Sequence, residues 1–449
     1  MSIAFLAFVF LGTLIAAILL GVPIAFSLIL SAIITAFSMG GGITNPQIIA
    51  IQLMQGADSV TLMALPFFIV AGEFMNRGGI TKRLIDFADI LVGRLRGGLG
   101  YVAIIACLLF SPLVGSAIAS AAALGAILIP MMAKAGYDRA KSAGLVASAH
   151  LITPIMPPSV PLIIYGAVAS VSIQSLFLGG IAPAIYITAV MCGVWLVVSR
   201  KDNIRSNKPR PTFKEAFKVF RGGFWALLLP VFVLVGLRSG QFTATEAGVI
   251  AVVYAILVGA FVYRELTLKE LFRGLVSGAK MSAVVMFLAA ASLVSGFMLT
   301  ISRIPQVITA SLAPLVAQPL LLMLVLMILI VIMGLVLDVI PTILIMTPIM
   351  MPLLHVAGID LVYFGIVFTL ANVLGLTSPP VGPLLNIACA TGDVKMEKLL
   401  PTIIPYYIWQ CVLLVLFVLF PELITVPLRW FAGYTALPMQ NILSVIFGG

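Results

Sequence analysis

Two pairs of adjacent prolines, Pro157-Pro158 and Pro379-Pro380, interrupt long apolar stretches. Proline inside a helix removes one backbone hydrogen bond and clashes with the preceding turn, so each pair predicts two half-helices joined by a break. At membrane depth the freed backbone groups must line a polar cavity or bind an ion. Carbonyls ending the first half-helix, around 155–157 and 377–379, can coordinate a cation such as Na+, and N–H groups opening the second can meet an anion. The alternative, prolines that only kink packed helices, is favoured for one such pair but not for two.

Small and polar residues upstream of each proline pair extend the predicted site. Asp338 lies among apolar residues from 331 to 345, where a carboxylate is costly unless it faces a cation, water or a polar partner. Its alternative role is an N-cap, and both roles can coexist. For the serines and glycines near 115–120 the alternative is close helix packing. Sodium is the only metal expected, and its candidate ligands are Gly115, Ser116, Ser120, Pro157, Gly334, Asp338, Thr377, Ser378 and Pro379.

Other polar residues have simpler interpretations. His150 and His355 are too few and too far apart to predict a metal site, and His150 is more simply a hydrogen-bonded helix residue than a proton relay. Glu246 opens an apolar span, where capping is its default role. The sequence has no Walker A loop, HExxH or GxSxG motif. We therefore expect no enzyme and no cofactor, with energy from an ion gradient rather than ATP.

The elements that position these residues must be membrane helices. Of 449 residues, 62% are apolar and 9% charged, whereas soluble domains carry about a quarter charged residues. The apolar runs are continuous, which favours helices over the alternating strands of a barrel. The net charge of +10 comes from short clusters between these runs, which is typical of membrane orientation and not of nucleic-acid binding. Tyr406, Tyr407 and Trp409 are interpreted as residues of the membrane interface.

An internal repeat relates the two halves of the chain. At a shift of 222 residues, Ile127–Asp138 aligns with Ile349–Asp360, and the two proline pairs coincide. Basic loops stay in the cytoplasm. The loop at 134–142 is basic and the segment at 171–177 is uncharged, whereas their counterparts at 356–363 and 393–398 show the opposite bias. The two halves are therefore predicted to lie upside down relative to each other, as in inverted-repeat transporters.

The predicted fold is an all-α polytopic membrane protein with two inverted-topology repeats, each containing a re-entrant hairpin and a broken helix. Spans are expected near 3–20, 22–37, 59–76, 177–199, 223–238, 245–263, 280–300 and 399–420, with a basic turn from 77 to 96. This map leaves 22 of the 25 Lys and Arg residues in the cytoplasm. The predicted divisions are a first repeat (1–199) with a cytoplasmic-side hairpin at 100–133, a basic cytoplasmic linker (200–222), a second repeat (223–420) with a periplasmic-side hairpin at 322–355, and a C-terminal tail (421–449).

Motifs through nearly the whole chain resemble the large membrane subunit, DctM type, of the tripartite ATP-independent periplasmic (TRAP) transporters. Singly each motif is weak, and together they are specific. They are Leu65–Glu73, Ile129–Met132, Pro157–Ser159, Thr243–Ala247, Gly334–Asp338 and Gly375–Gly382.

This resemblance implies a bacterial inner-membrane transporter with an elevator-type architecture, in which hairpins and broken helices carry solute past a fixed scaffold. It also implies Na+ as the coupling ion, a small four-helix membrane subunit, and a periplasmic binding protein that delivers a small organic anion, a carboxylate or sugar acid. The substrate-binding candidates are Ser159, Asn372 and Gly382. Asn372 is included because the family often has Asn at the adjacent place, which is Ala371 here. The first hairpin tip, at 111–120, is poorer in hydroxyls than the family pattern.

Three other functions compete with this one. The nearest rival is a stand-alone ion-coupled carboxylate carrier of the same superfamily. An intramembrane enzyme using Asp338 and His150 lacks a second acid or a nucleophile in a corresponding place. A passive channel does not explain paired broken helices.

Overall fold

The structure is a computed structural model that describes residues 3–39, 46–59, 61–110, 117–202, 212–304, 306, 313–379, 382–434 and 436–437. Within these ranges the regular structure is entirely helical. The elements are α1 (Ile3–Leu19), α2 (Ile24–Met39), α3 (Pro46–Ala57), α4 (Ala64–Arg77), α5 (Ile80–Val92), α6 (Gly98–Phe110), α7 (Ala117–Lys134), α8 (Arg139–Ala149), α9 (Val160–Val168), α10 (Ile173–Lys201), α11 (Phe213–Arg238), α12 (Ala244–Leu257), the π-helical turn η3 (Val258–Val262), α13 (Leu268–Ile301), α15 (Ala313–Val316), α16 (Pro319–Gly334), α17 (Val339–Val356), α18 (Leu361–Leu376), α19 (Pro383–Gly392), α20 (Met396–Leu419) and α21 (Glu422–Ala432).

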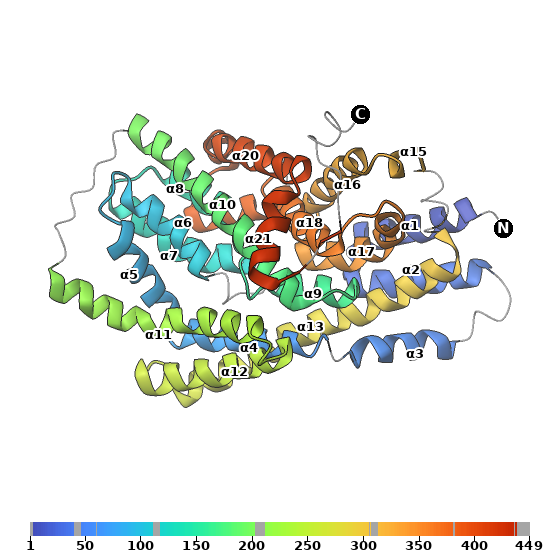
Figure 1. Ribbon diagram of the computed structural model, residues 1–449, viewed down its shortest axis with the longest axis horizontal. Coiled ribbons are helices and arrows are strands. Elements are labelled where there is room, and N and C mark those ends of the chain that lie inside the picture. Colours follow the sequence, from blue (N-terminus) through green and yellow to red (C-terminus); the bar gives the residue numbers. More distant parts are fainter. Residues whose placement is uncertain are drawn as a thin grey trace.

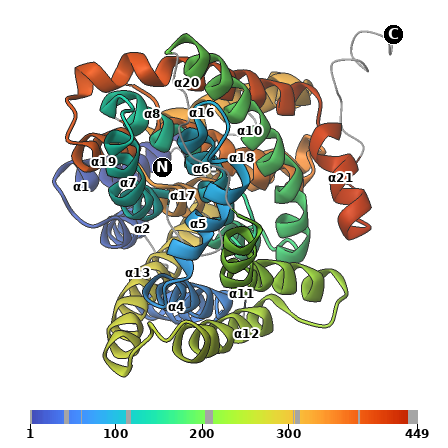
Figure 2. The ribbon, with the colours of Figure 1, turned by 90° about the vertical axis from the view of Figure 1, so that its left-hand side faces the viewer.

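The helices form two layers (Figures 1 and 2). In the scaffold layer, α13 packs against α2, α3 and α4, and α12 packs against α4 and α11. The hairpin layer contains the two hairpins, α6–α7 and α16–α17, and the two broken helices, α8–α9 and α18–α19, together with α10 and α20. The layers meet where α4 contacts α9 and α13 contacts α17. A further contact between the layers joins α4 to α10, where the rings of Phe68 and Phe177 meet edge-on with their centroids 6.2 Å apart.

The second half repeats the first in inverted orientation. α7 and α17 each have 18 residues and begin 222 residues apart, as do α8 and α18. Contacts between the halves are reciprocal, because α7 packs on α19 and α17 packs on α9. The start of α8 lies beside the end of α19, where Arg139 Nη1 is 3.5 Å from Asp393 Oδ2. The start of α18 lies beside α9, where the Tyr165 hydroxyl donates to the Leu361 carbonyl at 2.8 Å.

Several helices begin at caps that the sequence contains in both halves. Asp138 caps α8 by accepting from the N–H of Lys141, and Asp360 caps α18 by accepting from the N–H of Tyr363. Such caps satisfy N–H groups that have no partner within the helix. Glu246 forms a reciprocal capping box with Thr243, as the sequence predicts.

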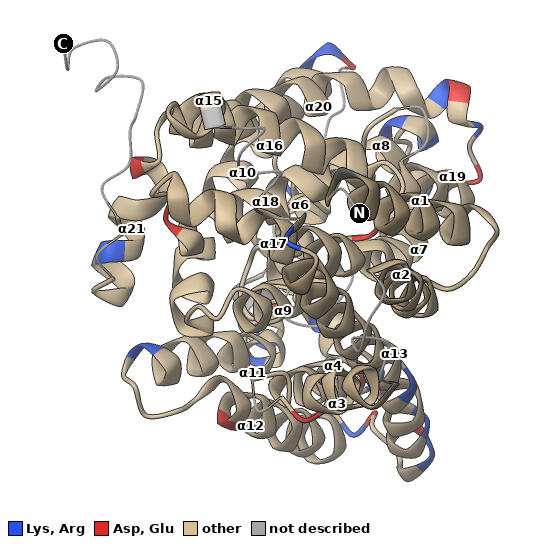
Figure 3. Ribbon diagram, turned by 90° about the vertical axis from the view of Figure 1, so that its right-hand side faces the viewer, with Lys and Arg blue, Asp and Glu red and all other residues tan. Residues whose placement is uncertain are grey.

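The surface is that of a membrane protein. Seven helices in the described ranges are long and apolar enough to cross a bilayer, and six shorter apolar helices accompany them. Large apolar side chains such as Phe8, Phe261 and Leu268 point outward, which only an apolar solvent makes favourable over so many positions. Most of the charged residues lie at helix ends and turns (Figure 3).

The structure corrects three parts of the predicted map. The basic turn expected at 77–96 contains α5, because Ile80, Leu84 and Ile85 are spaced to bury one face of a helix while Arg83 pairs with Glu265 at 2.9 Å. The span predicted at 59–76 corresponds to α4 alone, and α3 (Pro46–Ala57) precedes it where no element was predicted, whereas α13 is continuous for 34 residues. α13 also starts 12 residues before the span predicted at 280–300, and its length of about 51 Å exceeds the hydrocarbon core.

The proposed domain limits stay predictions. Within the predicted linker at 200–222, α10 continues to Lys201, residues 203–211 lie outside the described part of the chain, and α11 begins at Phe213. The predicted tail at 421–449 contains α21, and its residues from 438 onward lie outside the described part.

Candidate functional site

The connector between α8 and α9 is longer than the sequence predicts. The first half-helix ends at Ala149, with His150 as its C-cap, so residues 150–159 form the break. Successive turns continue it, with N–H groups of 150–153 each donating to the carbonyl three residues earlier. The carbonyls at 155–157 therefore do not end the first half-helix, which corrects the expected geometry. The physical reason is that a third proline, Pro154, precedes the Pro157-Pro158 pair. A residue before a proline avoids the helical backbone region, so the helix ends upstream of Pro154.

Backbone groups of this connector face protein at two points. A Cβ added to Gly180 of α10 would lie 2.4 Å from the Ile155 carbonyl oxygen, so this carbonyl is closed off by α10. Pro157 is buried, and its peptide bond to Pro158 is cis. Ser159 caps α9: its Oγ accepts from the N–H of Leu162 and donates to the Pro154 carbonyl. Ser159 is therefore the N-cap of α9.

The connector between α18 and α19 matches the predicted position of the second break. α18 ends at Leu376, and the hydroxyls of Thr377 and Ser378 both donate to the Leu374 carbonyl, at 2.9 and 2.8 Å. A hydroxyl that donates its proton in this way keeps its oxygen lone pairs for another donor or a cation. Pro379 is exposed, and Pro380 lies outside the described residues. Gly382 precedes α19, and its carbonyl accepts from the N–H of Leu385 at 2.8 Å.

The second hairpin packs directly on the last turns of α18. A Cβ on Gly334 would lie 2.3 Å from the Asn372 carbonyl oxygen and 3.0 Å from Gly375 Cα. Gly375 is equally tight, since its Cβ would lie 2.3 Å from the Val331 carbonyl oxygen. Only glycine permits this approach of two helix backbones. Asp338 is partly buried and caps α17, with its Oδ1 accepting from the N–H of Val339 at 2.8 Å. The N-cap interpretation of Asp338 is confirmed.

Asn372 is the most unusual polar residue of this region. It is completely buried, and neither its amide nitrogen nor its amide oxygen has a hydrogen-bond partner among the described residues. Every residue of α18 from Val362 to Leu376 is also buried, so bulk solvent does not reach this side chain. Leaving both ends of an amide without partners costs about 1–3 kcal/mol per group, which a bound ligand would offset.

The first hairpin has a parallel but different arrangement. Gly115 and Ser116 lie outside the described residues, so their predicted roles stay predictions. Ser120 is buried in the first turn of α7, and its Oγ donates to the Ala117 carbonyl at 3.2 Å. His150 contacts this turn through the backbone of Ser120, while its Nδ1 lies 2.6 Å from the Val146 carbonyl oxygen. His150 is thus a buried, hydrogen-bonded residue at the end of α8, as the simpler interpretation has it.

Comparison with known proteins decides the family. The family model described as "Tripartite ATP-independent periplasmic transporter, DctM component" matches residues 11–423. The chain belongs to the DctM family of TRAP transporter large permeases. It is 43% identical over 422 residues to the 2,3-diketo-L-gulonate TRAP transporter large permease protein YiaN of Escherichia coli, covering 94% of this chain and 99% of the relative.

Two further TRAP large permeases extend the comparison. The C4-dicarboxylate protein DctM of Pseudomonas aeruginosa is 35% identical over 371 residues, covering 83% of this chain and 86% of that one. The sialic acid protein SiaM of Vibrio cholerae is 34% identical over 414 residues, covering 92% and 96%. Membership makes the chain a non-enzymatic transport protein and a multi-pass protein of the bacterial inner membrane.

The fold has a relative of known structure. The Alcanivorax borkumensis YdaH transporter, described as having an unusual topology, superposes with a TM-score of 0.59 at 14% identity, covering 84% of this chain and 89% of that one. The predicted fold class is thereby confirmed. The likeness concerns the fold alone.

In this TRAP permease two residues of α20 that were not predicted as site residues contact the second connector and the end of α8 before the first connector. Tyr407 of α20 is half-buried, and its hydroxyl lies 2.7 Å from Ser378 Oγ. Gln410, one turn later, is buried, and its Nε2 donates to the Ser148 carbonyl at 2.8 Å. The interface role expected for Tyr406 is wrong as well, because only 2% of Tyr406 is exposed, whereas Trp409 is 52% exposed. The sequence signal that could have identified Gln410 is a glutamine inside an apolar span.

Proposed function

We propose that this TRAP permease imports a small organic anion in symport with Na+, with Asn372 at the centre of the solute or ion site. The observation that carries the proposal is the buried Asn372 amide without partners among the described residues, next to the second connector and the tip of the second hairpin. An amide oxygen is a good ligand for a hard cation, and the amide N–H groups are donors for a carboxylate.

Sodium is supported by oxygen groups at the end of the same helix and at the start of α17. Thr377 and Ser378 place two hydroxyl oxygens at the end of α18, where the helix dipole is negative. Such oxygens, with backbone carbonyls freed at the break, are the ligands that broken helices offer to Na+ in transporters. Asp338 supplies a carboxylate at the start of α17, and we assign it the charge that a bound cation needs.

The class of solute is supported by the relatives and by the second half-helices. The relatives are described as carrying 2,3-diketo-L-gulonate, sialic acid and C4-dicarboxylates, all of which are carboxylates. In this chain α9 and α19 open at Ser159 and Gly382, and a helix start favours an anion through its free N–H groups. Within the family, the proposed partners are the small membrane subunit and a periplasmic binding protein that delivers the anion.

The proposed mechanism is an elevator movement of the hairpin layer along the scaffold layer. The two-layer arrangement supports it, because both hairpins and both broken helices belong to one layer and pack on each other. Apolar contacts such as Phe68 with Phe177 lie between the layers, and contacts of this kind can slide without breaking strong polar bonds.

Uptake by purified protein in proteoliposomes tests the proposal. We expect accumulation of a carboxylate solute only when the small subunit, the loaded binding protein and an inward Na+ gradient are all present, with no need for ATP. Uptake that persists undiminished without sodium would refute the coupling. Full uptake without the binding protein would favour the alternative, a stand-alone ion-coupled carboxylate carrier.

A further inference from the structure

Helix α20 contacts the second break and, within one helical turn, the last turn of α8 that leads into the first break. The Tyr407 hydroxyl lies 2.7 Å from Ser378 Oγ in the second connector, and Gln410 Nε2 lies 2.8 Å from the Ser148 carbonyl oxygen in the last turn of α8. Residues three apart are neighbours on a helix surface. A single rigid turn therefore joins two segments that are separated by 230 residues in the sequence.

The bond at Ser378 has a defined direction. Ser378 donates its own proton to the Leu374 carbonyl at 2.8 Å, so the Tyr407 hydroxyl is the donor between the two side chains. Removing that hydroxyl leaves the Ser378 hydroxyl with its bond to the Leu374 carbonyl of its own helix. The connector then loses this side-chain bond to α20.

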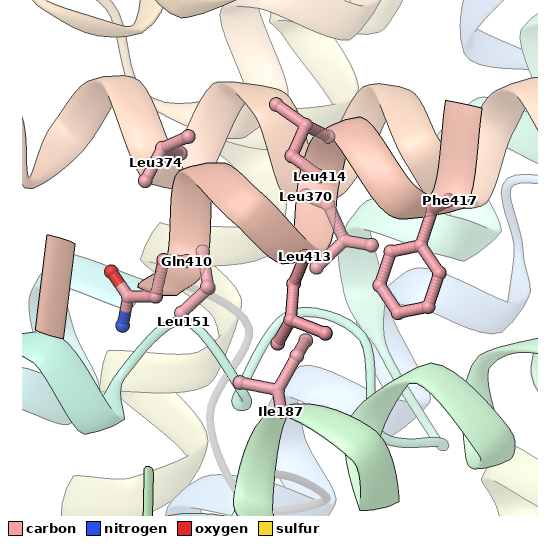
Figure 4. Close-up of a pocket in the computed structure, with 8 residues that line it drawn as sticks. All are labelled: Leu151, Ile187, Leu370, Leu374, Gln410, Leu413, Leu414 and Phe417. Atoms are coloured by element: carbon pink, nitrogen blue, oxygen red, sulfur yellow. The ribbon is translucent and has the colours of Figure 1, made fainter. Parts of the chain in front are cut away.

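Gln410 is fixed on one side and free on the other. It is 2% exposed, and its Nε2 also contacts Met191 Sδ of α10 at 3.4 Å. Its Oε1 has no hydrogen-bond partner among the described residues. The side chain borders a cavity of about 10 Å³, close to the size that holds one water. Leu151 of the first connector and Leu374 of α18 line the same cavity, so both broken helices meet α20 there (Figure 4).

We propose that Tyr407 and Gln410 are positioning residues that hold the second connector and the end of α8, which leads into the first connector, in one relative arrangement, so that binding at one connector changes the affinity at the other. This inference rests on the proposed sodium-coupled function and assigns the coupling between its two half-sites to α20. Neither residue is placed on the ion or the solute. Each acts through the connector that it holds.

The test uses Tyr407→Phe, Gln410→Met and the double variant in the complete transporter in proteoliposomes. Both substitutions keep the side-chain volume, and thermal denaturation checks that each variant is folded. One lost hydrogen bond predicts a three- to tenfold rise, roughly, in the sodium concentration for half-maximal uptake. If α20 couples the connectors, the double variant changes this value by less than the product of the single changes, and the Hill coefficient of uptake against sodium concentration is lower than in wild type.

Two matched controls lose similar bonds elsewhere. Tyr254→Phe removes a 2.7 Å bond to the Trp225 carbonyl within the scaffold layer, and Thr402→Val removes the 3.2 Å bond from α20 to the Ala140 carbonyl, away from both connectors. Both are expected to keep the wild-type sodium dependence. Folded variants at 407 and 410 that match these controls would overturn the proposal, as would strictly multiplicative effects.

Uptake by the wild-type protein distinguishes a failure of the proposed sodium coupling from a failure of the role assigned to α20. Sodium-independent uptake by wild type would refute the proposed coupling ion, and the solute KM of the same variants would then decide the role of α20. Sodium-dependent wild type with unaltered Tyr407→Phe and Gln410→Met proteins would refute only the role of α20.

Discussion

Gly334→Ala should separate the second hairpin from its broken helix. The added Cβ would lie 2.3 Å from the Asn372 carbonyl oxygen and 3.0 Å from Gly375 Cα. Both neighbours are backbone atoms, so neither can rotate away, and relief requires about 1 Å of movement between α16 and α18. Overpacking of this kind costs about 1–3 kcal/mol. Since the moved segment carries Asn372, we expect uptake to fall at least about tenfold, because a 1 Å misplacement at a reacting or binding site has effects of that size.

The measurements are initial uptake rate and melting temperature, with Gly193→Ala as the control. Gly193 lies in α10, and a Cβ there would have nothing within 4 Å. The control is expected to match wild type in both measurements, or to be slightly more stable because alanine favours helix. A Gly334→Ala protein with wild-type uptake and melting temperature would refute the reasoning, because it would mean that α16 and α18 are not in backbone contact during transport.

Three other predictions test separate features. Asp338→Asn keeps the N-cap but removes the charge, so we expect normal insertion with a lower apparent Na+ affinity; unchanged sodium dependence would leave Asp338 as a cap only. Single cysteines at the exposed positions Ala135 and Val356 should be labelled from the cytoplasm and the periplasm respectively, and labelling of both from one side would contradict the inverted topology. Asp360→Ala should destabilise the protein by about 2 kcal/mol or more, against about 1 kcal/mol for Asp138→Ala, in chemical or thermal denaturation; equal losses would contradict the reasoning. The difference arises because Asp360 is buried and also accepts from the Tyr434 hydroxyl at 3.0 Å, whereas Asp138 is an exposed cap.

The fold was predictable where local chemistry and the repeat agreed. Proline pairs marked both breaks, and basic loops gave the inversion, because each signal acts through a few neighbouring residues. α5 was missed because its charges were weighted above its buried face, formed by Ile80, Leu84 and Ile85. The early end of α8 was missed because the prediction placed the break at the Pro157-Pro158 pair alone, and the local effect of Pro154 was not counted.

The candidate site was predictable in part for the same reason. Asp338 and Ser159 are caps, and capping depends on the adjacent turn, so sequence sufficed. Tyr407 and Gln410 form their bonds with partners 29 and 262 residues away. Such pairings depend on how the two halves are placed against each other, and one sequence does not contain that information. The isolation of the Asn372 amide likewise follows only from the complete burial of α18.

The reciprocal packing of the two halves has a consequence for their origin. α7 rests on α19 and α17 rests on α9, so each hairpin is completed by a broken helix of the other half. A half-length chain could build these contacts only as a pair of oppositely oriented copies. Such an ancestor would have had to insert into the membrane in both directions, with little charge bias between its loops. Joining such copies through a basic segment would fix one orientation for each and would free the two sequences to diverge. The two connectors differ: one has a buried carbonyl against Gly180, and the other has a tyrosine hydroxyl on Ser378. Two covalently linked halves can diverge in this way, whereas two identical copies cannot.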